Sequence, residues 1–90
     1  MKHVSIRVYG KVQGVFFRAS ALEKAEELGI NGNVRNNPDG GVGIEAEGGE
    51  ENLQAFIAWC NRGPKFAQVE RCDVNDAAFR NYKGFTIERA

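Results

Sequence analysis

Two segments with helical periodicity, separated by a hairpin, constrain most what this chain folds into. In residues 17–28 the apolar side chains recur on one stripe, namely Phe17, Ala21, Leu22, Ala25 and Leu28. In residues 50–61 they fall at i, i+3, i+4 and i+7, namely Leu53, Phe56, Ile57 and Cys60. Trp59 lies off this second stripe and is expected to cover its edge. Each helix therefore has one apolar face, and both faces must be buried against other elements.

The segments around these helices have the pattern of β-strands. Residues 4–8 alternate apolar and polar side chains, which is typical of a strand in an antiparallel sheet with one buried face. Residues 31–36 and 42–47 flank a strong turn sequence, Asn-Pro-Asp-Gly-Gly, at residues 37–41. These two strands are therefore predicted to form a hairpin between the helices.

Two further strands are predicted after the second helix. The apolar residues of the strand at 68–74 change parity, which predicts a bulge or an irregular strand. Residues 75–83 are predicted as a loop before a short strand at 85–88. The order is then β-α-β-β-α-β plus one short terminal strand. Two helices on one face of a mainly antiparallel sheet in this order make an α+β fold, the ferredoxin-like split βαβ sandwich. We expect a single domain over residues 1–90.

Composition and charge narrow the classes of function. The net charge is zero and the pI is about 6.6, which disfavours a general nucleic-acid binder and a polybasic membrane protein. No apolar run reaches transmembrane length, and the sequence shows no signal peptide. Neither His3 nor the cysteines have metal-ligand spacing, so we expect neither a metal nor a cofactor. Cys60 and Cys72 are interpreted as reduced thiols, with a single disulfide as the alternative. We expect a cytoplasmic monomer that binds no nucleic acid and no membrane.

The segment from Gly10 to Arg18, Gly-Lys-Val-Gln-Gly-Val-Phe-Phe-Arg, joins the first strand to the first helix. A glycine-containing turn at the start of a helix presents unpaired backbone N–H groups in a small concavity, where the helix dipole adds positive charge. Arg18 lies at the first helical turn, and its planar guanidinium is suited to a phosphate or a carboxylate. The residues alone therefore predict an anion site, with a solvated surface arginine as the alternative interpretation of Arg18.

Two motifs in register carry a resemblance to a known family. Gly10-Lys-Val-Gln-Gly-Val-x-Phe-Arg18, followed by Gly32-x-Val-Arg-Asn36 and Asp39-Gly40, resembles the acylphosphatases over essentially the whole chain. The resemblance implies the ferredoxin-like fold. It also implies hydrolysis of acyl phosphates, which are mixed carboxylic–phosphoric anhydrides, to a carboxylate and inorganic phosphate without a metal or cofactor.

The resemblance also assigns roles by motif position. Arg18 matches the substrate-binding arginine, and Asn36 matches the asparagine that orients the attacking water. The backbone of the loop matches the phosphate cradle, which comprises Gln13, Gly14, Val15, Phe16, Phe17 and Arg18. From the residues alone, Asn36 is better explained as a residue that opens the turn at Pro38, so its catalytic role depends on the resemblance.

Three positions depart from the usual pattern of the family. Phe16 stands where a small residue, often glycine, is common; Asn33 replaces a customary aromatic residue; and Gly43 stands where glutamate often follows the Asp-Gly turn. Because neither matched catalytic position is lost, activity is expected. The alternative is a catalytically weakened module that binds phosphate or a partner on the same fold, with Phe16 narrowing the cradle. An RNA-binding module is disfavoured by the neutral charge.

Overall fold

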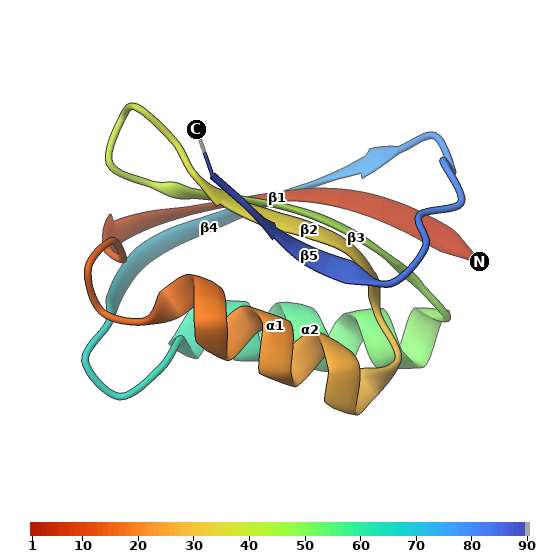
Figure 1. Cartoon of the computed structure of the whole chain (residues 1–90), viewed down its shortest axis with the longest axis horizontal. Helices are drawn as coiled ribbons and strands as arrows, with labels where there is room; N and C mark the ends of the chain where they lie inside the picture. The colour runs from red at the N-terminus through yellow and green to blue at the C-terminus, as the bar shows by residue number, and fades with distance from the viewer. Residues whose placement is uncertain (90) are drawn as a thin grey trace.

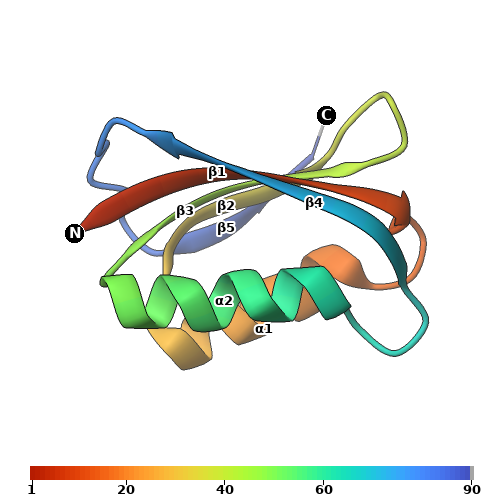
Figure 2. The same cartoon turned by 180° about the vertical axis from the view of Figure 1, so that it is seen from behind.

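Two helices cover one face of a five-stranded sheet in the computed structural model, which describes residues 1–89 (Figures 1 and 2). The elements are β1 (Lys2–Lys11), α1 (Phe17–Leu28), β2 (Asn31–Asn36), β3 (Val42–Gly48), α2 (Glu50–Arg62), β4 (Gln68–Ala77) and β5 (Phe85–Glu88). The predicted order of elements is confirmed. The elements β1, β3, α2 and β4 extend beyond their predicted bounds.

The largest extension is in β4, and the prediction of a loop over residues 75–83 is wrong for residues 75–77. Because β1 begins at Lys2, its first residues extend far enough to pair with residues 75–77 of β4. His3, for example, pairs with Ala77. The strand β4 forms one edge of the sheet, and residues 75–77 are exposed. A strand segment that is buried on neither face has no alternating apolar pattern, which is why the sequence did not indicate it.

The strand order across the sheet is β4-β1-β3-β2-β5. The strand β1 pairs antiparallel with β3 and β4, and β2 pairs antiparallel with β3. The exception is β5, which pairs parallel with β2. The mainly antiparallel sheet, with both helices on one side in Figure 2, confirms the predicted ferredoxin-like α+β fold.

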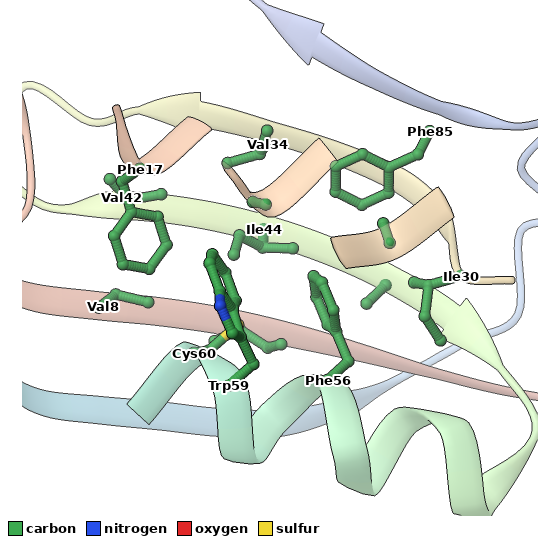
Figure 3. Packing of buried hydrophobic residues seen from close by; sticks show 14 of the residues in the cluster. Val8, Phe17, Ile30, Val34, Val42, Ile44, Phe56, Trp59, Cys60 and Phe85 are labelled. Atoms are coloured by element: carbon green, nitrogen blue, oxygen red, sulfur yellow. The ribbon is translucent and has the colours of Figure 1, made fainter. Parts of the chain in front are cut away.

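The hydrophobic core lies between the sheet and the two helices (Figure 3). The alternation predicted for the strands is present, since the inward-facing residues are buried, among them Ile6, Val8, Val34, Val42 and Ile44. Trp59, expected to cover the edge of its stripe, is buried, and its ring centroid lies 5.2 Å from that of Phe17 on α1. Because α1 and α2 pack side by side, a residue at the edge of one apolar stripe contacts the other helix.

The predicted bulge in β4 is confirmed beside the end of β1. Tyr9 pairs with Arg71 and Gly10 pairs with Val69, which leaves Glu70 as the extra residue. Gly10 has φ +128°, and a Cβ atom there would lie 2.2 Å from the carbonyl oxygen of Gln68. This close approach of two backbones requires glycine, and it fixes how β1 enters the loop that follows.

A buried polar cluster holds the segment that joins β4 to β5. These two strands lie at opposite edges of the sheet, so residues 78–84 cross one end of it (Figure 1). Glu47 is 2% exposed, and its carboxylate accepts hydrogen bonds from the backbone N–H groups of Arg80 and Tyr82. The buried His3 ring places Nδ1 2.6 Å from the carbonyl oxygen of Ala78. These contacts fix the crossing segment, and with it the position of β5.

Replacement of Glu47 by glutamine is expected to destabilise the fold. Burial raises the pKa of the Glu47 carboxyl, but the N–H groups of Arg80 and Tyr82 and the nearby His3 together lower the pKa below its ordinary value of 4.5. The ionised carboxylate therefore stabilises the fold above about pH 4.5, and this contribution is lost as the pH falls through the lowered pKa. Glu47→Gln keeps only one acceptor oxygen for two N–H groups. We expect the free energy of unfolding at neutral pH to fall by about 2 kcal/mol.

Urea unfolding followed by the fluorescence of Trp59 measures this loss of stability. Glu23→Gln is the matched control, because Glu23 is exposed on α1 and its replacement should change little. The difference between wild type and Glu47→Gln should begin to shrink as the pH falls below the ordinary glutamate pKa, where the unfolded chain takes up the proton, and should be smallest below the lowered pKa of Glu47, where the folded wild type is protonated as well. A difference that stayed constant from neutral pH to pH 3 would show that the charge of Glu47 does not carry the effect.

Candidate active site

A cleft of about 280 Å³ opens beside the loop between β1 and α1. It brings together most of the residues singled out from the sequence, namely Gly14, Phe16, Phe17, Arg18 and Asn36. The other lining residues are Val12, Ala19, Ile87 and Arg89. The loop, the end of β2 and the end of β5 thus meet at one place, and the size of the cleft suits a small ligand.

The loop presents backbone N–H groups that have no partner among the residues that the structure describes. Gly14 and Phe16 adopt the left-handed conformation, with φ +75° and +64°, while Val15 between them does not. Left-handed residues of this kind are typical of loops in which neighbouring N–H groups form an anion-binding concavity. Within residues 1–89, no backbone or side-chain acceptor bonds to an N–H group of residues 13–19. The first turn of α1 belongs to this set, so the helix dipole adds partial positive charge.

Gln13 holds the loop against the hairpin that carries Asn36. Its side-chain amide Nε2 donates to the carbonyl oxygens of Asn37 and Gly41, each at 2.8 Å. The Gln13 side chain does not line the cleft, and Val15, two residues further along the loop, is buried in the core. In the predicted phosphate cradle, Gln13 and Val15 therefore have side chains that shape the loop, while Gly14, Phe16, Phe17 and Arg18 line the cleft.

The charges around the cleft favour an anion. Arg18 lies in the first turn of α1 and Asn36 ends β2, and both side chains are partly buried. Arg89 adds a second guanidinium to the lining. Among the residues that the structure describes, no aspartate or glutamate lines the cleft, and none forms an ion pair with Arg18. The Arg18 guanidinium is thus available to a phosphate or a carboxylate.

Ile87 and Arg89 are lining residues that the sequence analysis did not identify. They reach the cleft because β5 pairs parallel with β2, with Arg35 opposite Glu88, so the residue after β5 lies beside Asn36 at the end of β2. The short apolar pattern of residues 85–88 indicates a strand but not its neighbour. A basic residue directly after a terminal strand is the only local signal, and it is too common to be informative.

The three departures from the family pattern differ in their relation to the cleft. Asn33 and Gly43 lie on β2 and β3 on the sheet face opposite the helices, and neither lines the cleft. At Gly43 a Cβ atom would lie 2.9 Å from Cζ of Arg35, so the Arg35 side chain occupies the space beside this glycine. Phe16 does line the cleft, with its side chain 75% exposed.

The described side chains support neither a metal site nor a cysteine nucleophile. In residues 1–89, no cluster of three or more His, Cys, Asp or Glu residues is placed to hold a metal ion. Cys60 and Cys72 are free thiols, and burial raises the pKa of both, so neither is an activated nucleophile. Neither α1 nor α2 has the length and apolar character needed to cross a membrane.

Comparisons with known proteins identify the family of the chain and agree with its fold. The sequence model of the acylphosphatase family matches residues 4–87. An acylphosphatase from Methylococcus capsulatus is 54% identical over 78 residues, covering 87% of this chain and 85% of that protein, and one from Shewanella amazonensis is 46% identical over all of both chains. The crystal structure of acylphosphatase from Bacillus subtilis superposes with a TM-score of 0.95 at 35% identity, covering 98% of this chain and 99% of the other. The chain belongs to the acylphosphatase family.

Proposed function

We propose that the cleft hydrolyses acyl phosphates to a carboxylate and inorganic phosphate. The observation that carries this proposal is the loop before α1, which lies beside Arg18; within residues 1–89 its N–H groups are unpaired and no aspartate or glutamate lines the cleft. Membership of the acylphosphatase family, with relatives of that name at 43–54% identity, is consistent with the reaction and does not favour the weakened binding module. Phe16 is exposed and lines the cleft, whose volume is about 280 Å³.

The N–H groups of the loop and the Arg18 guanidinium bind the phosphoryl oxygens. In the transition state the charge on these oxygens is spread over the phosphoryl group, and donors fixed before the reaction stabilise it without further reorganisation. Gln13 keeps this arrangement rigid through its two hydrogen bonds to the hairpin. Arg18 therefore acts as the substrate-binding residue.

Asn36 orients the attacking water. Its amide oxygen accepts a hydrogen bond from the water without acquiring a charge, whereas a carboxylate at this position would repel the phosphate. The water oxygen attacks phosphorus, the bond between phosphorus and the acyl oxygen breaks, and its electron pair stays with the departing carboxylate. The protons of the water remain with the phosphate product and the solvent. Because a carboxylate is a weak base, the leaving group needs little general-acid help.

Hydrolysis of benzoyl phosphate followed by absorbance, in buffer containing EDTA, tests the proposed function. We expect turnover that is unaffected by the chelator and is competitively inhibited by inorganic phosphate, because the product occupies the same cradle. Absence of turnover, together with measurable phosphate binding, would instead support the weakened phosphate-binding module.

We propose that the protein acts as a monomer, as a single domain over residues 1–90, in the cytoplasm. Its net charge of zero gives no general attraction to nucleic acid, and its two free thiols are typical of a reducing compartment. Analytical ultracentrifugation tests the monomer, with a dimer at micromolar concentration as the contradicting result.

A further inference from the structure

The cleft has an apolar side that binding of a phosphoryl group does not use. Phe16 lines it with a side chain that is 75% exposed, and Ile87 of β5 lines it while packing partly against the core. The other apolar lining residues offer little surface to a ligand, because Val12 and Phe17 are buried and Ala19 is small. An exposed phenylalanine alone is ordinary on a protein surface, but this one lies beside Arg18 and Asn36.

The backbone at Phe16 adds a second, independent observation. Phe16 has φ +64° and is the residue before the first turn of α1, where it forms no side-chain cap. Large side chains seldom adopt this left-handed conformation, and such outliers are concentrated at ligand sites. A glycine would satisfy the same backbone without strain. The ring is therefore held at the cleft at a cost in conformational energy, while most of its surface contacts solvent.

We propose that Phe16 is a specificity-determining residue whose ring, together with Ile87, contacts the acyl group of the substrate. This inference rests on the proposed function. The phosphoryl group is common to all acyl phosphates, so the cradle and Arg18 cannot distinguish one acyl group from another. The apolar surface beside the cradle can distinguish acyl groups, because an aromatic or branched acyl group buries more area on this surface than an acetyl group does. The ring thus raises the efficiency for apolar acyl groups relative to acetyl phosphate.

The test compares kcat/KM for benzoyl phosphate with kcat/KM for acetyl phosphate in wild type, Phe16→Ala and Phe16→Gly. We expect the ratio of the two values to fall about tenfold in both variants, which corresponds to loss of one aromatic contact. Phe79→Ala is the matched control, because Phe79 is 50% exposed in the segment that crosses the far end of the sheet, and its ratio should equal that of wild type. The inhibition constant of inorganic phosphate, measured for each variant, reports whether the cradle is intact.

The two Phe16 variants separate the ring from the backbone. Alanine removes the ring but keeps a Cβ atom in the left-handed conformation, whereas glycine also removes the strain. A ratio that fell only in Phe16→Gly would assign the effect to backbone conformation and overturn the inference. Wild-type ratios in both variants, with both substrates turned over, would also overturn it. Failure of the wild type to hydrolyse either substrate would refute the proposed function itself.

Discussion

Arg18→Ala is expected to lower kcat/KM for benzoyl phosphate about 1,000-fold and to abolish measurable binding of inorganic phosphate. The Arg18 guanidinium lines the cleft and pairs with no aspartate or glutamate among the described residues, so its removal takes away the positive charge in the first turn of α1, next to the N–H groups of the loop. Loss of an arginine that stabilises a transferring phosphoryl group costs about 10³-fold or more in other enzymes. Steady-state kinetics and isothermal titration calorimetry with phosphate measure the two effects separately.

Two further variants make this result specific to Arg18. Arg7→Ala removes an exposed arginine of β1 that does not line the cleft, so its kcat/KM should stay within about twofold of wild type. Arg18→Lys keeps the charge but loses the planar fork, and we expect it to recover only part of the phosphate affinity. An Arg18→Ala protein that binds phosphate as tightly as wild type would show that the loop N–H groups alone hold the substrate.

The fold was predictable because burial on one side imposes a period on the sequence. The alternation in residues 42–47 and the spacing of Leu53, Phe56 and Cys60 both follow from contact with the same core. Where that cause is absent, prediction failed. Residues 75–77 are exposed on an edge strand, so their sequence has no apolar period and they were predicted as a loop.

The candidate site was predictable in part for a similar reason. Its loop is local in sequence, so the glycines and Arg18 indicate an anion site before any tertiary contact is known. Ile87 and Arg89 come to the cleft through the parallel pairing of β5 with β2, and β5 is positioned by polar contacts of the crossing segment with His3 and Glu47. Contacts between residues so far apart in the chain leave no signal in the local pattern of residues 85–88.

Asn36→Ala is expected to lower kcat at least about 100-fold while changing the affinity for phosphate little. The cradle and Arg18 remain in this variant, so the substrate still binds, but no amide oxygen fixes the water for attack on phosphorus. This size is expected because removal of one well-placed polar side chain from other active sites lowers kcat by a similar factor. Single-turnover kinetics at saturating enzyme, alongside KM and the inhibition constant of phosphate, separate the chemical step from binding.

The variant Asn36→Asp keeps a hydrogen-bond acceptor for the water but adds a negative charge, so it tests whether the neutral amide is required at this position. A carboxylate is nearly isosteric with the amide and accepts a hydrogen bond from water, but its charge lies beside the anion bound at Arg18. We therefore expect Asn36→Asp to lower kcat and also to weaken phosphate binding, unlike Asn36→Ala. Asn31→Ala, at the opposite end of β2 and outside the cleft, should leave both quantities unchanged. A near-normal kcat in Asn36→Ala would remove Asn36 from catalysis and leave it as the residue that opens the turn at Pro38.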